Sequence, residues 1–264
     1  MVKVLLQLCL TTLNAACWLL PMKMKRFVDN KMAMSVASAF SGGVFLSLAF
    51  GHMIPHAQHG FEGMDVPNSV PYYLTLGGYM LIFFVEKVAF DTHAVMHGEE
   101  GENGSTDAVT SGRSATILLL ALSVHSLFET MALGLSDSSI NVLLLAMSIG
   151  LHQPAESVAL LVAFLKSGLS QQRIVRMLSL FSAVGPLGML AGIMVSQYAS
   201  KIADAVLVAM AAGTFIYVGA TEVIAEEFEH PVEGKWKKFG ALVGGIVMIM
   251  FITSWAEALE AQAA

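Results

Sequence analysis

The sequence predicts an all-α protein, a polytopic membrane bundle of eight transmembrane helices. Of its 264 residues, 56% are hydrophobic and only 13% are charged, which is far from the balance of a soluble domain of this size. The apolar residues also fall into eight runs, each long enough to cross the roughly 30 Å of hydrocarbon in a bilayer. We therefore treat residues 1–264 as a single transmembrane domain.

The eight runs follow one another along the chain, mostly with short connections. They are Val2–Leu20, Ala33–Ile54, Pro71–Phe90, Ser114–Leu135, Asn141–Leu165, Val175–Val195, Asp204–Ala225 and Phe239–Trp255. The first run is long enough to be retained as a span rather than removed as a signal peptide. Between the third and fourth runs, residues 97–113 are rich in Gly, Ser and acidic residues. This composition predicts a flexible loop.

The distribution of basic residues predicts the orientation. Most Lys and Arg residues lie after runs one, three, five and seven: Lys23, Lys25, Arg26, Lys31, Arg113, Lys166, Arg173, Arg176, Lys235, Lys237 and Lys238. The opposite side holds Lys3 and Lys201. By the positive-inside rule the first set is cytoplasmic, as is the loop 97–113, and both termini are non-cytoplasmic. We expect the plasma membrane to be the host membrane.

Several classes of protein are not expected. The chain has no basic tract with interleaved aromatic residues, so nucleic acid is not a predicted partner. It has no GxxxxGK[ST] loop, which argues against direct use of ATP. Cys9 and Cys17 lie too far apart on one predicted helix to form a mutual disulfide.

Two neighbouring runs each carry a histidine and a glutamate four residues apart. His125 and Glu129 share one helix face, and His152 and Glu156 share another. Only the short segment Asp137–Asn141 resembles a turn between the two helices, so they should run antiparallel as neighbours. Each histidine lies about 13 residues from that turn, roughly 20 Å along its helix. Both pairs should therefore lie at the same depth, near the bilayer centre.

Two glutamates at that depth need a partner. An ionised carboxylate at the centre of a membrane helix costs about 2.5–3.5 kcal/mol even on a lenient insertion scale. One divalent cation would neutralise both Glu129 and Glu156. Two imidazoles and two carboxylates suit Zn(II), and also Fe(II), Mn(II), Co(II) or Cd(II), whereas the lack of a thiolate argues against Cu(I).

Other polar residues have two interpretations each. His52 and His56 share a helix face at the predicted outer end of the second run, where they either capture a cation or bond water and lipid headgroups. On the opposite side, His93 and His97 either receive an ion on release or belong to a solvated acidic loop. Glu222 is a lone carboxylate in the seventh run. We expect it to be buried with a hydrogen-bond partner, and a direct ligand role is the alternative.

These motifs resemble those of the ZIP (Zrt/Irt-like) family of metal-ion transporters. The segment His125-Ser-Leu-Phe-Glu129-Thr-Met-Ala-Leu-Gly134 is similar to the HSxxEGxAxG pattern of the family's fourth helix. His152-Gln-Pro-Ala-Glu156 is similar to the HQxxEG pattern of its fifth helix. Gly42–Leu46 with His52–Pro55 resembles the second helix, and Ala212–Val218 with Glu222 resembles the seventh.

The resemblance implies eight helices with both termini outside, and transport of a divalent metal ion, most often zinc, towards the cytosol. Carried over by position, His125, Glu129, His152 and Glu156 are the metal ligands. Some family members hold a second metal with Asn and Asp where this chain has Ser126 and Gln153, so we expect one strong site here with these two residues as auxiliary. Thr130 and Ser157 also depart from the family's usual glycine.

We predict a non-enzymatic carrier that works by alternating access. Its partners would be the metal ion and membrane lipid, and a homodimer is compatible with such a bundle. The alternatives are a metal-selective channel and an intramembrane zinc enzyme with Glu129 or Glu156 as general base. The enzyme would need an open coordination position and a substrate cleft, and the sequence contains no HExxH motif.

Overall fold

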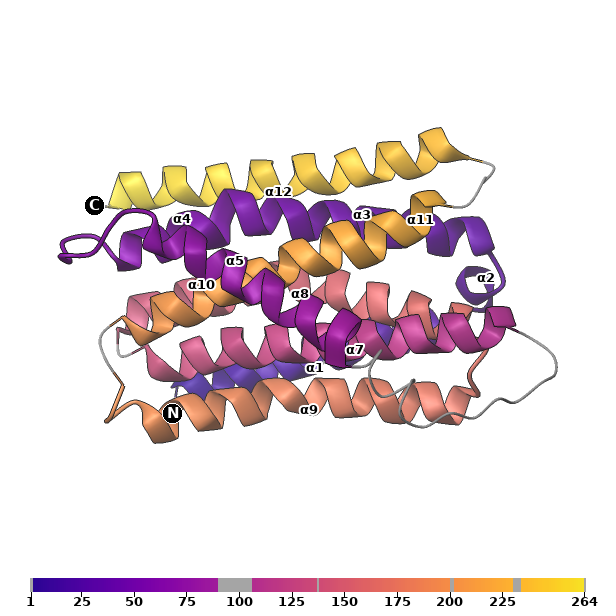
Figure 1. Ribbon diagram of the computed structural model, residues 1–264, viewed down its shortest axis with the longest axis horizontal. Helices are drawn as coiled ribbons and strands as arrows, with labels where there is room; N and C mark the ends of the chain where they lie inside the picture. The colour runs from indigo at the N-terminus through magenta and orange to yellow at the C-terminus, as the bar shows by residue number, and fades with distance from the viewer. Residues whose placement is uncertain (1, 90–105, 137, 200–201, 230–233, 264) are drawn as a thin grey trace.

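The computed structural model describes residues 2–89, 106–136, 138–199, 202–229 and 234–263, and within these ranges the chain is helical and contains no strand. The helices are α1 (Val2–Lys23), α2 (Lys25–Val28), α3 (Lys31–Leu48), α4 (Ile54–Gly60), α5 (Val70–Phe83), α7 (Thr106–Leu135), α8 (Ser139–Lys166), α9 (Gln171–Val195), α10 (Ala203–Ile216), α11 (Ala225–Glu229) and α12 (Lys235–Ala263). Three π-helical segments continue helices: Ala49–Met53, Phe84–Ala89 and Tyr217–Ile224. The long helices lie side by side along one axis (Figure 1), which confirms the predicted polytopic bundle.

The described residues contain seven helices that are long and apolar enough to cross a membrane, so the predicted count of eight is not confirmed. The predicted third run, Pro71–Phe90, forms α5 and the π-helical segment after it, and is not among the seven. Its tyrosines and its charged pair, Glu86 and Lys87, make it less apolar than the others. Both termini nevertheless lie at the same end of the bundle (Figure 1), as an even number of crossings requires.

The long helices pack as two groups. The site-bearing group consists of α1, α7, α8 and α9, in which α7 packs on α9 and α1 packs on both α8 and α9. The flanking group consists of α3, α4, α5, α10 and α12, in which α12 packs on α3 and α10 packs on α5. The two groups meet where α7 lies against α10 and where α8 lies against α3. Figure 1 shows the flanking group above the site-bearing group.

The predicted flexible loop, residues 97–113, differs from the structure where the two overlap. Helix α7 begins at Thr106, so the last residues of the predicted loop are its first two turns. An established helix extends at little cost, because propagation fixes one residue per new hydrogen bond whereas nucleation fixes several. The remainder, residues 97–105, lies outside the described residues.

Close contact between α5 and α10 depends on glycine. A Cβ atom added to Gly78 would lie 2.0 Å from the backbone oxygen of Met210, whereas one added to its neighbour Gly77 would meet no atom within 4 Å. Replacing Gly78 with alanine should therefore push α5 away from α10 and destabilise the protein by about 1–3 kcal/mol, the usual cost of overpacking. The measurement is thermal unfolding of the purified protein in detergent.

Gly77→Ala is the matched control, because it makes the same chemical change one residue away. It should leave the unfolding midpoint unchanged or slightly raised, since alanine has the higher helix propensity. Equal midpoints for the two variants would show that the contact between α5 and α10 does not require a glycine.

A buried ion cluster lies at the end of the bundle opposite the termini. Glu227 on α11 pairs with Lys166 at the end of α8 and with Lys238 at the start of α12. The Nζ atom of Lys238 lies 3.1 Å from Glu227 Oε2 and 2.9 Å from the Glu227 carbonyl oxygen. Glu227 and Lys238 are both buried. The cluster therefore joins the site-bearing group to the flanking group through the buried carboxylate of Glu227, although Lys166 itself is 25% exposed.

Candidate metal centre

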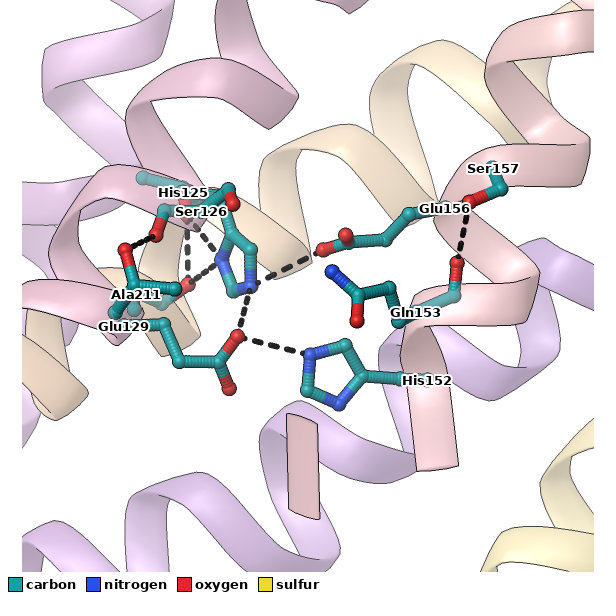
Figure 2. Close-up of polar contacts among 10 residues, drawn as sticks. His125, Ser126, Glu129, His152, Gln153, Glu156, Ser157 and Ala211 are labelled. Atoms are coloured by element: carbon teal, nitrogen blue, oxygen red, sulfur yellow. Dashed lines mark hydrogen bonds and ion pairs between the residues drawn. The ribbon is translucent and has the colours of Figure 1, made fainter. Parts of the chain in front are cut away.

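The structure brings the four predicted ligands together. His125 and Glu129 lie on α7, and His152 and Glu156 lie on α8, which is its neighbour as the short turn predicted. All four side chains are buried, and each offers a ligand atom within 4.8 Å of the other three. Figure 2 shows the two carboxylates and two imidazoles converging on one point. Both histidines lie near the midpoints of their spans.

The distances within the cluster are close to those of a tetrahedral zinc site. Zinc bonds of about 2.0–2.1 Å separate two tetrahedral ligands by roughly 3.3 Å. His152 Nε2 lies 3.0 Å from Glu129 Oε2, and His125 Nε2 lies 3.5 Å from the same oxygen and 3.4 Å from Glu156 Oε1. Small side-chain rotations would therefore place these atoms on one ion.

Helix α10 sets the orientation of His125. His125 Nδ1 lies 2.9 Å from the Thr214 hydroxyl and 3.0 Å from the Ala211 carbonyl oxygen. The carbonyl can only accept, and the Thr214 hydroxyl donates to that same carbonyl at 2.7 Å. The ring proton must therefore be on Nδ1, which leaves the Nε2 lone pair facing the carboxylates, the tautomer that a metal ligand needs.

Phe215 forms the apolar wall of the site. Its ring stacks on His125 with centroids 3.5 Å apart and an interplanar angle of 12°, and it meets the edge of the His152 ring at a centroid distance of 5.0 Å. Phe215 is itself fully buried. The wall fixes both imidazole planes and limits the access of water to the cluster.

The polar atoms of the site fit a cation. His125 Nε2 and Glu156 Oε1 are buried and lack hydrogen-bond partners among the described residues. The lone pair of His125 Nε2 faces the carboxylate oxygens of Glu129 and Glu156. Lone pairs at such distances repel one another unless a positive charge lies between them. A divalent cation supplies that charge and offsets both carboxylates.

The hydroxyl of Thr214 offers a test of this orientation. Thr214→Val keeps the shape of the side chain but removes one of the two oxygens that lie within hydrogen-bond distance of the Nδ1 proton of His125. We expect zinc affinity to fall about 10–100-fold, the usual effect of losing an outer-shell partner of a metal-bound histidine. Competition with a chelator on purified protein measures the affinity.

Thr221→Val is the matched control, because Thr221 lies further along the same helical span, 3.5 Å from the Tyr79 hydroxyl. It should leave zinc affinity unchanged. Equal affinities in the two variants would refute the role assigned to Thr214.

The two auxiliary residues are both buried beside the ligands. Figure 2 shows the amide of Gln153 between His152 and Glu156, and its Oε1 has no hydrogen-bond partner among the described residues. Ser126 follows His125 on α7, and its carbonyl accepts a hydrogen bond of 2.6 Å from Thr130. Gln153 therefore presents a free oxygen near the site, and the contact of Ser126 with Thr130 involves its backbone carbonyl rather than its hydroxyl.

The structure places His52 and His56 outside the four-ligand cluster. His52 lies in the π-helical segment Ala49–Met53 and His56 on α4, and His52 interacts electrostatically with His152 and Glu129. His93 and His97 lie outside the described residues.

Glu222 lies in the π-helical segment Tyr217–Ile224, outside the cluster of four ligands. Its side chain is partly buried and lies close to that of Glu86, whose Oε2 accepts a hydrogen bond of 2.6 Å from the Tyr217 hydroxyl. The full burial expected for Glu222 is therefore not observed, and its role stays a prediction.

Sequence reasoning missed the residues that position the ligands. Thr214 and Phe215 were part of the matched seventh-helix motif, but their contacts with the histidines were not foreseen. The available signal for Thr214 was a hydroxyl within a mostly apolar run, and for Asn14 in α1 it was an amide within such a run. Asn14 accepts a hydrogen bond of 2.6 Å from Ser182, and its carbonyl accepts one from Ser157, which joins α1 to α9 and α8.

Comparison with known proteins gives consistent matches. The family described as ZIP Zinc transporter matches residues 1–111 and 91–253. Mouse Zinc transporter ZIP1 is 27% identical over 232 residues, which cover 75% of this chain and 72% of the mouse protein. Human Zinc transporter ZIP2 is 26% identical over 296 residues, covering 94% of this chain and 96% of its own length. Zebrafish Zinc transporter ZIP1 is 26% identical, covering 83% of this chain and 84% of its own length.

Proposed function

The chain belongs to the ZIP zinc transporter family, and from this premise we propose that it carries Zn(II) across the membrane towards the cytosol. The observation that carries the proposal is the buried cluster of His125, Glu129, His152 and Glu156 at mid-span. With a divalent ion these ligands have no net charge, which lowers the cost of holding the ion in a low-dielectric region.

The packing supports an alternating-access mechanism. All four ligands belong to the site-bearing group, whereas Thr214 and Phe215, which cover them, belong to the flanking group. Sliding or rocking of one group against the other would uncover the ligands first on one side and then on the other. Because protons compete with metal for imidazole and carboxylate, protonation of the ligands would favour release.

The proposed orientation rests on charge. The termini lie at one end of the bundle (Figure 1), and the basic connections, with Lys23, Lys166, Arg173 and Lys235, lie at the other. The positive-inside rule makes the basic end cytoplasmic and both termini non-cytoplasmic. We propose the plasma membrane as the location, which surface biotinylation of intact cells would test.

The ligand set favours Zn(II) but does not restrict the site to it. Two imidazole nitrogens and two carboxylate oxygens also accept Fe(II), Mn(II) or Cd(II), so each remains a proposed substrate. Gln153 Oε1 is the proposed auxiliary ligand, with Ser126 beside it. A homodimer also remains a proposal, which a mass measurement in detergent would test.

The relatives are named as zinc transporters and not as enzymes, so the intramembrane enzyme is set aside. A channel through the same site is distinguished by kinetics. A carrier saturates at low metal concentration, whereas flux through a pore rises almost linearly and follows the membrane potential.

The decisive experiment is zinc uptake into proteoliposomes that contain the purified protein. We expect zinc uptake to saturate. Fe(II), Mn(II) and Cd(II) should each inhibit zinc uptake in proportion to their affinity for the same site. Lack of uptake by folded protein of either orientation would overturn the proposed function.

A further inference from the structure

The second membrane span changes geometry on its way to the end of the bundle that holds the termini. It runs as α3, continues through the π-helical segment Ala49–Met53 and ends as α4 (Ile54–Gly60). π-helical segments are rare and frequently lie at functional sites. This one carries His52, and His56 follows one turn later.

The two imidazoles lie at chelating distance. The His52 and His56 rings have centroids 6.0 Å apart and an interplanar angle of 38°. Two imidazoles bound to one tetrahedral zinc have centroids about 5 Å apart, which a small side-chain rotation achieves. Histidines four residues apart on one helix face form a recognised zinc-binding pair.

The pair lies on a line of increasing burial that leads to the metal centre. At the outer end of the line, His59 Nδ1 contacts Glu62 Oε1 at 2.8 Å, and the side chains are 73% and 66% exposed. His56 and His52 are partly buried. At the inner end, His52 interacts electrostatically with His152 and Glu129 of the four-ligand cluster.

We propose that His52 and His56 form a second zinc-binding site, separate from the four-ligand site and filled from the side of the termini. Two neutral imidazoles and water molecules bind the ion there more weakly than the two carboxylates and two imidazoles of the central site. The negative charge of Glu129 attracts a cation at His52 while the central site is unfilled. Once the central site holds zinc, that attraction is lost, so the outer site is occupied chiefly before transfer.

Zinc binding at the pair does not depend on transport, although its role as an entry site rests on the proposed function. Equilibrium dialysis of the full-length protein in detergent against zinc tests the binding directly. In the double variant His125→Ala/Glu156→Gln, which disables the central site but keeps the negative charge of Glu129, we expect about one zinc per chain to remain. Adding His52→Ala and His56→Ala to that variant should remove this zinc.

His59→Ala is the matched control, because His59 follows on the same helix face but is exposed; in the central-site variant it should leave the remaining zinc in place. X-ray absorption at the zinc edge should show about two imidazole ligands in that variant. Zinc binding that is unchanged by His52→Ala and His56→Ala would overturn the proposal.

The two proposals fail in different ways. Suppose that dialysis shows zinc binding that depends on His52 and His56, but the unmodified protein shows no zinc uptake. The transport function would then be refuted, and the second site would be supported. Saturable uptake together with no zinc dependent on His52 and His56 would do the reverse.

Discussion

Replacing Glu156 with glutamine is expected to abolish zinc uptake by the reconstituted protein. The amide keeps the size of the side chain but removes a ligand charge, so the loaded site would carry a net charge of +1. A charge at the bilayer centre costs about 2.5–3.5 kcal/mol, which corresponds to a loss of roughly 100-fold in uptake. Glu156→Ala should be equally inactive.

The loss should not arise from misfolding. Glu156 Oε1 makes no hydrogen bond to the described residues, and glutamine keeps the size of the side chain, so the variant should insert and unfold like the unmodified protein. Glu229→Gln is the matched control, because Glu229 is exposed and far along the chain from the ligands. Uptake by Glu156→Gln that equals uptake by Glu229→Gln would contradict the assignment of Glu156 as a ligand.

The second large effect is expected on stability, at Glu227. Glu227→Gln would leave the buried ammonium group of Lys238 without its counter-charge and would also break the pair with Lys166. Removing one partner of a buried ion pair usually costs about 3–5 kcal/mol, because the remaining charge stays desolvated. We expect a clear fall in the thermal unfolding midpoint of the protein in detergent.

The adjacent residue provides the comparison. Glu226 lies 3.6 Å from Lys166, but its side chain is 39% exposed, so Glu226→Gln should cost less than about 1 kcal/mol. Double replacement of Glu227 and Lys238 by uncharged residues should recover part of the loss, since no unpaired charge then remains on Lys238. Similar midpoints for Glu226→Gln and Glu227→Gln would show that the buried cluster contributes little.

Hydropathy alone anticipated most of the bundle. The thickness of the hydrocarbon layer sets the length of a spanning helix, so the apolar runs coincide closely with the long helices, as in Val2–Leu20 for α1 and Val175–Val195 for α9. Mean hydropathy identifies a spanning helix less clearly where the helix carries polar groups that hydrogen-bond to neighbouring helices. This is the case for the third run, whose Glu86 is buried against Tyr217.

Helix boundaries in polar segments were harder to predict. The composition of residues 97–113 indicates a loop, yet α7 begins at Thr106. Composition reports the average preference of a segment, whereas the start of a helix also depends on the stability of the helix that it extends. The sequence alone could not weigh these two contributions.

The sequence by itself determined the membrane class and predicted the four residues that form the buried His/Glu cluster. These four residues could be predicted because their arrangement is local. The i,i+4 spacing places each His–Glu pair on one helix face, and a short turn brings α7 and α8 together. Only the tertiary structure decided what surrounds them. The carbonyl of Ala211, 86 residues from His125, fixes the tautomer of that histidine, and Glu227, 61 residues from Lys166, joins the two helix groups. Such contacts depend on which helix faces pack together, and helical periodicity marks the apolar face of a helix without naming its partner.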